Sequence, residues 1–465
     1  MAVTDQHPQY IAAKPRWKIM QDAVAGEEEI KQATIKYLPK TAGMIEAEKH
    51  GDSTGQIYKG YITRAQYPLW VQDALRTMIG LVSKLNPEIK IESNLMKGLL
   101  ENATNDGFDL KQLFIRIVSE LLTNGRCGLL VDVDSQGKPY LALYDALSII
   151  NWKETNVGGR KDLSLVVLEE QHDNSEDKFG HNTKTVQRVL SLDDGHLYVE
   201  LYTGNSTEDK TPSLGGKHLE FTPFIFCGTI DNSPNVGTIP LLTMAKAALK
   251  YYQLSADYFQ SLHHTAHPQP WISGLDDTTD ISVTGVMAAW LLPRESQCGY
   301  LEIEGNGIEK TKLEMDAQKS SALEAGSKVI DTNAQESGEA RRARQDDQHA
   351  SLYSIVMCAA EAIEQAIKYA ALWLKLNPDS YTFSVKPEFS SDSVDPTILK
   401  QLYDGAISGK NSTQTYWEYM ATGKLPERTY EEEMELVESE QVNQPMPAYN
   451  MNGANNEQND TTGTV

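Results

Sequence analysis

The sequence has little that would suit it to a membrane, to disulfide cross-linking or to a wide contact with nucleic acid. No stretch approaches the roughly 18 consecutive apolar residues of a membrane helix, and residues 1–15 lack the basic-then-apolar order of a signal peptide. The four cysteines show no paired spacing, so we expect them to be reduced, as in cytosolic proteins. With 42 basic against 65 acidic residues, the net charge of −23 excludes a broad basic footprint for nucleic acid. Such acidity either serves solubility alone or lets a duplex slide past without adhering.

A complete phosphate-binding loop is also missing. Gly215-Gly216-Lys217 resembles the end of such a loop, but Thr211 stands where the motif needs glycine, and His218 where it needs Ser or Thr. No nucleophile elbow of the Gly-x-Ser-x-Gly type occurs. The sequence therefore predicts neither a nucleotide site nor catalytic residues.

Two segments resemble metal sites in part. His263 and His267 would share a helical face, as zinc ligands do, but His264 replaces the glutamate of the metalloprotease pattern. We interpret them as a polar helix end. Asp132–Gly137 opens like a calcium loop, yet the twelfth position is Leu143 instead of glutamate, and a hairpin turn explains the same residues. We expect no metal and no cofactor.

The period of the apolar residues predicts an α+β module over residues 100–235. Helical spacing at 67–85 and 109–123 gives way to a period of two. Strands so close together, without helices between most of them, favour an antiparallel meander. The predicted strands are 129–133, 163–169, 185–192, 197–203 and 219–226.

The second half of the chain is predicted to be mainly helical. A helix that begins at Pro240 and ends at Pro268 precedes a small compact insertion. The remaining elements are a helix at about 313–328, a polar break at 331–338, a long apolar-faced helix over 352–374, a short strand at 382–385, helices over 395–440 that end in an acidic run, and a disordered tail.

Three arginines stand out in this acidic chain, namely Arg341, Arg342 and Arg344. They lie next to the polar break and could give this segment a local affinity for phosphate groups, which the negative net charge of the chain would not predict. The alternative is a solvated first turn of the long helix, in which they pair with Asp346 and Asp347.

The order of these parts resembles the portal proteins of tailed bacteriophages, which serve as head-to-tail connectors in DNA packaging. An α+β module leads into a helix, a small insertion, a second helix, a polar loop and a long helix. The resemblance covers residues 55–440, and local stretches at 61–65, 128–132, 395–409 and 423–426 agree with it. No single motif is sharp, and residues 1–50 and 441–465 match nothing in the family.

The resemblance implies the phage portal fold, with an α+β wing, a two-helix stem, a small clip insertion and long wing and crown helices. The implied divisions are an N-terminal arm (1–60), wing (61–236), first stem helix (237–267), clip (268–310), second stem helix (311–330), tunnel-loop-like segment (331–340), long wing helix and strand (341–394), helical crown (395–440) and disordered tail (441–465).

By the same resemblance, the chain forms a homo-oligomeric ring, typically a dodecamer, at one capsid vertex of the virion, after assembly in the host cytoplasm. Double-stranded DNA passes through its channel. Its partners would be terminase, capsid and scaffolding proteins, and later head-completion or tail proteins, with no membrane. Candidate channel residues are Lys319, Lys328, Arg341, Arg342 and Arg344. The alternatives are a stand-alone α/β hydrolase-like enzyme and another ring or connector component of a virion.

Overall fold

The computed structural model divides the chain into two compact units, Met1–Pro387 and Glu388–Val465. Each unit is described by itself below. The structure describes residues 2–134, 136–157, 159–175, 178–204, 206–212, 219–266, 269–274, 295, 297–301, 306–327, 338–387, 396–422, 425–426 and 428–442. Among these residues, no helix is long and apolar enough to cross a membrane.

The N-terminal segment is helical, and its first helix belongs to the core. Helix α1 (Pro8–Ala25) buries Trp17 and Met20 completely, and the Trp17 indole donates a hydrogen bond to the Asn124 carbonyl at 2.8 Å. The expectation of an N-terminal arm over residues 1–60 is therefore wrong for α1. Helices α2 (Glu27–Gln32), α3 (Ala42–Lys49) and α4 (Gln56–Arg64) follow, with the short 3-10 turn η1 (Thr34–Lys36) between α2 and α3.

The two helices predicted before the strands are confirmed as α5 (Trp70–Ser83) and α7 (Leu110–Asn124), with the short α6 (Gly98–Glu101) between them. Asp109 caps α7 by accepting the Gln112 amide at 2.7 Å, the usual role of an N-cap carboxylate. Gly125 ends α7 at φ 70°, and a Cβ there would lie 2.5 Å from the Thr238 carbonyl oxygen. Only glycine fits both requirements.

Two antiparallel sheets form the α+β module, which confirms the predicted fold class and meander. One has the order β3-β2-β9, from Pro139–Asp145, Arg126–Val133 and Phe224–Gly228. The other has five strands in sequence order: β4 (Ile149–Val157), β5 (Arg160–Asp173), β6 (Thr183–Asp193), β7 (His196–Thr203) and β8 (Ser206–Asp209).

Two details of the strand prediction need correction. The strand expected at 219–226 lies at Phe224–Gly228. Pro223 just before it has no N–H to donate to a sheet, and the Thr222 hydroxyl binds the Leu163 carbonyl at 2.6 Å. Strands β3 and β4, which complete the two sheets, were not predicted as strands.

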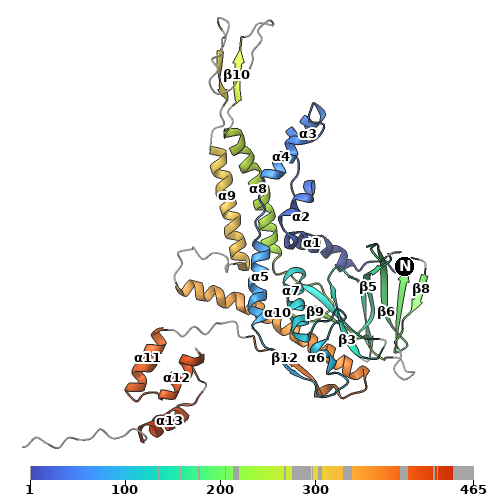
Figure 1. Cartoon of the computed structure of the whole chain (residues 1–465), viewed down its shortest axis with the longest axis vertical. Helices are drawn as coiled ribbons and strands as arrows, with labels where there is room; N and C mark the ends of the chain where they lie inside the picture. Colours follow the sequence, from blue (N-terminus) through green and yellow to red (C-terminus); the bar gives the residue numbers. More distant parts are fainter. Residues whose placement is uncertain are drawn as a thin grey trace, which may run out of the picture. The chain divides into compact units, whose positions relative to one another are not determined.

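A helical hairpin extends from this body and carries a short β-hairpin at its far end (Figure 1). Helix α8 (Leu242–Ala266) runs out, strands β10 (Gln269–Ser273) and β11 (Gln297–Leu301) pair antiparallel, and α9 (Asn306–Ala322) returns beside α8. A π-helical turn, η2 (Leu323–Ser327), continues α9. The sequence predicted a helix, a short insertion and a second helix in this region, and these elements follow one another in that order.

The long helix predicted next is α10 (Gly338–Trp373), which starts well before residue 352. Residues 338–340, expected in a tunnel-like loop, are helical instead, and Arg341–Arg344 continue that helix. The stretch from Glu339 to Gln345 consists of Glu, Ala, Arg and Gln, which are strong helix formers and outweigh one glycine at the start. The 3-10 turn η3 (Pro378–Ser380) follows, and β12 (Thr382–Ser384) then pairs with β1 (Glu88–Lys90).

The second unit contains α11 (Pro396–Ile407), α12 (Thr413–Thr422) and α13 (Tyr430–Val442). Two carboxylates of the acidic α13 cap the start of α12. Glu440 accepts the amides of Thr413 at 2.7 Å and Gln414 at 3.1 Å, and Glu433 accepts the amide of Ser412 at 2.7 Å. Part of the acidic run is therefore structural. The tail predicted to be disordered from 441 lies outside the described residues after Val442.

Candidate nucleic-acid interface

The stem, by which we mean α8, α9 and η2, is a helical pair held by a narrow contact. Among the described side chains of α9, only Met315 and Ala322 are buried, and Ile308, Thr311 and Gln318 are half-buried at the same helical spacing. The remaining described side chains of α9 are exposed. A helix with one narrow apolar stripe leaves most of its circumference free for other contacts.

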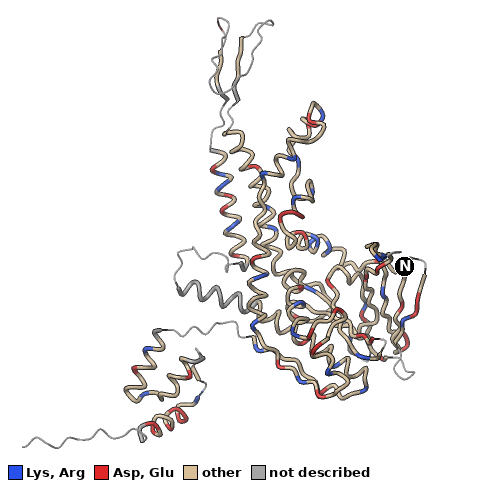
Figure 2. The backbone as a smooth tube through the Cα atoms, in the orientation of Figure 1, with Lys and Arg blue, Asp and Glu red and all other residues tan. Residues whose placement is uncertain are grey.

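Five lysines project from the stem, and all five are exposed. None of them forms an ion pair with a described residue. Some lysines elsewhere are held by carboxylates, as Lys40 is by Glu48 at 2.6 Å and Lys368 by Glu364 at 2.6 Å. Others, such as the exposed Lys138 and Lys184, form no ion pair with a described residue either. Figure 2 shows the basic positions along both stem helices. The stem lysines are Lys246, Lys250, Lys310, Lys312 and Lys319.

The stem is also locally neutral, although the chain carries −23 overall. Its five lysines stand with five acidic residues, and Asp257 is already bound to the Tyr61 hydroxyl at 2.5 Å. Exposed lysines without carboxylate partners can contact phosphate groups without first breaking an ion pair. Because the lysines are few and solvated, each such contact would be weak and reversible.

Of the candidate channel residues, Lys319 is an exposed member of the stem lysines. Lys328 lies outside the described residues. Arg341, Arg342 and Arg344 lie in the first turns of α10, where the structure describes the backbone only. The other four stem lysines were missed by sequence reasoning, although the spacing of Lys246 and Lys250 placed them on one helical face.

The histidines at the end of α8 give no sign of a metal site within the described chain. His264 Nε2 lies 2.7 Å from the Gln260 amide nitrogen, and the centroid of the His263 ring lies 5.9 Å from that of His264. His267 lies outside the described residues. No group of three or more described His, Cys, Asp or Glu side chains is placed to hold a metal ion.

The suspected calcium loop is a hairpin turn between β2 and β3. Asp134 accepts the amides of Gln136 at 2.8 Å and Lys138 at 2.9 Å, and Gly137 adopts φ 77°. Asp132 instead faces the other sheet, where Arg188 approaches it at 3.5 Å. The turn interpretation of this segment is therefore the right one.

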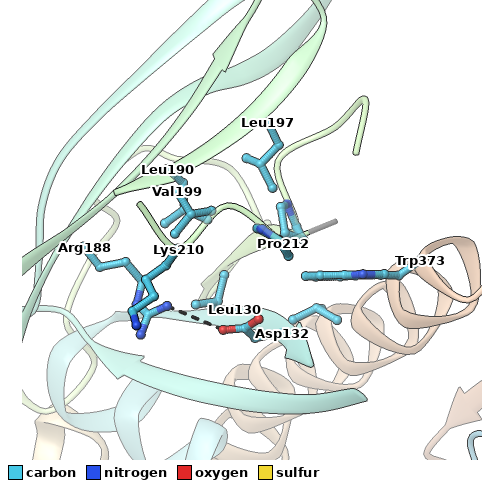
Figure 3. A pocket seen from close by; sticks show the side chains of 11 residues that line it. Leu130, Asp132, Arg188, Leu190, Leu197, Val199, Lys210, Pro212 and Trp373 are labelled. Carbon is cyan, nitrogen blue, oxygen red and sulfur yellow. Dashed lines mark hydrogen bonds and ion pairs between the residues drawn. The ribbon is translucent and has the colours of Figure 1, made fainter. Parts of the chain in front are cut away.

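A small pocket lies between the two sheets and the end of α10 (Figure 3). Its charged lining is already paired, with Arg188 Nε 2.6 Å from the Glu170 carboxylate. Burial alone would raise the pKa of Glu170, but the hydrogen bond and charge of Arg188 hold it below its usual value. We therefore interpret the pocket as part of the packing interface between the two sheets. Its lining includes Leu130, Asp132, Arg188, Lys210 and Trp373.

Comparison with known proteins gives one sequence family and several solved structures. A family described as a domain of unknown function, DUF4055, matches residues 240–374, which span the stem and α10. No curated protein matches the sequence.

Three of the solved structures that are similar to the chain come from gene transfer agent particles or from a phage portal protein. A chain in the neck of an empty gene transfer agent particle is 12% identical over 83% of this chain and 93% of that chain, with a TM-score of 0.41. A chain of the native gene transfer agent virion is 13% identical over 83% and 99%, with a TM-score of 0.40. An HK97 family phage portal protein from Corynebacterium diphtheriae is 11% identical over 68% and 92%, with a TM-score of 0.30.

Proposed function

We propose that the chain is a portal subunit, which forms a ring at one capsid vertex through which duplex DNA is packaged and ejected. The observation that carries this proposal is the stem, a projecting helical hairpin on a neutral stretch of an acidic chain, with five exposed lysines that pair with no described carboxylate. Terminase would dock on the ring during packaging, and head-completion or tail proteins would replace it later.

The charge distribution suits passage better than tight binding. A duplex carries one charge per about 1.7 Å of axis, so a densely basic channel would hold it strongly. An acidic ring repels phosphates, and sparse lysines repeated around the ring would give short-lived contacts that keep the duplex centred. The stem lysines are the described residues best suited to this role, and Arg341, Arg342 and Arg344 are further candidates.

Ring formation needs no catalytic group, and the force for packaging would come from the ATPase of the terminase. The main alternative is a hydrolase-like enzyme, for which the sequence offers no complete motif. A steady hydrolytic turnover by the purified chain, lost on substitution of a single side chain, would favour that alternative.

The role of the stem lysines can be tested with a matched pair of triple variants. In the first, Lys246, Lys250 and Lys319 become alanine. In the control, three exposed wing lysines, Lys138, Lys153 and Lys184, become alanine, so both variants lose the same charge. Both should form rings like the wild type. Only the stem variant should lower the amount of DNA packaged or retained per particle.

Two other results would count against the proposal. Equal packaging and retention by the stem variant and the wild type would show that these lysines do not contact the duplex. Rings that fail to form in the stem variant, while the control assembles, would assign the lysines to a subunit interface.

A further inference from the structure

We infer that α3 of one subunit packs against the outer face of α9 in the neighbouring copy of this chain. This interface rests on the proposed ring. It assigns a partner to two exposed surfaces. One is the solvent-facing side of α3 in the arm, by which we mean α3 and α4, and the other is the outer face of the stem helix α9.

The first surface is α3, which has little support within its own chain. Of residues 39–57, only Met44 is buried. The helix is held at its ends, where the Thr41 hydroxyl accepts the Met44 amide and Lys40 pairs with Glu48 at 2.6 Å. Ile45 on its outer side is 46% exposed. Helices of eight residues are marginal without tertiary packing, so this one is expected to gain a partner on assembly.

The α4 end of the same arm adds to this surface. Ile57 in the first turn of α4 is also 46% exposed, and the residues one and two turns further along the same helix bind α8. Tyr61 binds Asp257 at 2.5 Å and Arg64 binds Gln260 at 2.9 Å. The arm is therefore anchored to α8 through the second half of α4, and its two exposed isoleucines precede that anchor in the chain.

The second surface is the side of α9 that faces away from α8. Leu313 is 69% exposed, and the exposed Ala317 and Ser320 follow it at steps of four and three residues. These three positions lie opposite the stripe through Met315 that packs on α8. One large apolar side chain followed by small ones lets a second helix approach closely.

The two surfaces lie on different sides of α8, as head-to-tail assembly requires. Helix α4 binds α8 through Asp257 and Gln260, whereas α9 lies near Tyr251, whose pKa is raised by burial and by the nearby charge of Asp316. In Figure 1, the α3–α4 arm and α9 lie on either side of α8 along the same outer part of the stem. A rotation about an axis parallel to the stem would bring the arm of one copy to α9 of the next.

These observations favour a second copy over an unrelated partner. A ring interface joins one flank of a subunit to the opposite flank of the next, so both halves must occur in one chain. Each half here has exposed apolar side chains at a similar position along the stem, and one rotation satisfies both.

Single substitutions test each half against a matched control. Ile45→Asp and Leu313→Asp place a carboxylate in the contact, and Ile230→Asp makes the same kind of change at a residue that is 74% exposed elsewhere. All three should melt like the wild-type subunit, because the residues are exposed. The first two should raise the concentration for half-assembly by about tenfold or more, since a buried unpaired carboxylate is costly. The control should not.

Mixing the two defective variants tests the head-to-tail geometry. The Ile45→Asp variant retains the wild-type α9 surface, and the Leu313→Asp variant retains the wild-type α3 surface. One contact, between α3 of the Leu313→Asp variant and α9 of the Ile45→Asp variant, can therefore form. The mixture should stop at dimers of twice 51.7 kDa, whereas each variant alone stays monomeric.

Cross-linking tests the proximity directly. In a Cys298→Ser background, which removes the exposed native thiol, Ile45→Cys and Leu313→Cys would be combined. A bismaleimide spanning about 8–10 Å, the usual separation of packed helix axes, should link this double variant into a ladder of multimers. Each single-cysteine variant should remain unlinked.

The outcomes separate this inference from the proposed function. If the wild type forms rings and the two aspartate variants assemble like Ile230→Asp, the inference is overturned and the portal proposal stands. If only Leu313→Asp fails to assemble, α9 meets a surface other than α3, and the inference is again overturned. If the wild type never assembles, the portal proposal falls and this interface with it.

Discussion

The imidazole of His7 lies flat on the indole of Trp152, with ring centroids 3.9 Å apart and an interplanar angle of 22°. The same imidazole caps α1, because its Nδ1 accepts the Gln9 amide at 3.2 Å. The guanidinium of Arg126 also lies over Trp152, at 3.9 Å from the ring centroid. The start of α1 is therefore held to β4 by a neutral histidine next to a buried cation.

The first prediction concerns acid sensitivity. Burial and the charge of Arg126 lower the pKa of His7 below its usual 6.5. Both folded and unfolded chains carry a neutral His7 above that value, and as the pH falls through it the unfolded chain gains the proton first, so stability falls. His7→Asn keeps a cap but cannot titrate, and should lose less melting temperature than the wild type between about pH 7.5 and 5.5.

His50→Asn is the control for this prediction, because the His50 side chain is 73% exposed. Its stability should follow the pH like that of the wild type. An unchanged pH dependence in His7→Asn would contradict the assignment of the acid sensitivity to His7.

The second prediction concerns Arg126, which is 1% exposed and has no hydrogen-bond partner for its three side-chain nitrogens among the described residues. It lies over the rings of Trp152 and Phe226, and burial lowers its pKa to about 9. Arg126→Met fills the same space without a charge and should be neutral or stabilising. Arg126→Ala leaves a cavity and should cost about 2–4 kcal/mol in denaturant unfolding. A strong loss with methionine would show that the charge itself is needed.

The third prediction concerns the core face of α10. Ile363 is fully buried, so Ile363→Ala should lower the free energy of unfolding by roughly 2–5 kcal/mol. Leu372 on the same helix is 42% exposed, and Leu372→Ala should cost clearly less. Equal losses in urea titrations of the two variants would contradict the assigned face.

The fourth prediction concerns the carboxylate caps of α12. Glu440→Ala removes the acceptor for two amides and should lower the local stability of α12 by about 0.5–2 kcal/mol. The control is Glu438→Ala, because Glu438 is an exposed residue of α13, the helix that also contains Glu440. Hydrogen exchange of the α12 amides in the full chain is the measurement. If the α12 amides exchanged equally fast in the Glu440→Ala and Glu438→Ala variants, the assignment of Glu440 as a cap of α12 would be wrong.

The sequence predicted the elements whose stability comes from long apolar periods. Helices α7, α8 and α10 and the meander all have such patterns. For residues 1–60 the sequence predicted helices and an irregular arm. The burial of α1 was missed because two of its buried residues are the small Ala13 and Ala23, and because Pro15 lies inside the helix. Strands β3 and β4 were missed although each pairs with a neighbour in the sequence, β3 with β2 and β4 with β5.

The candidate site was harder to predict, because whether a lysine forms an ion pair with a carboxylate depends on the tertiary structure. Lys319 was expected in the channel, but the sequence alone does not show that Lys40 has a carboxylate partner and that Lys319 has none among the described residues. The caps provided by Glu433 and Glu440 join residues 21 to 27 positions apart, and no local pattern marks them. The placement of Arg341, Arg342 and Arg344 in the channel stays a prediction.

The mass of the purified chain in solution tests the central claim most directly. Native mass spectrometry or mass photometry over a range of salt and protein concentrations would give it. A portal subunit should form a closed species at a fixed multiple of 51.7 kDa, about twelvefold for a dodecamer, with little beyond it because a ring has no free ends. A monomer of 51.7 kDa under every condition would contradict the account.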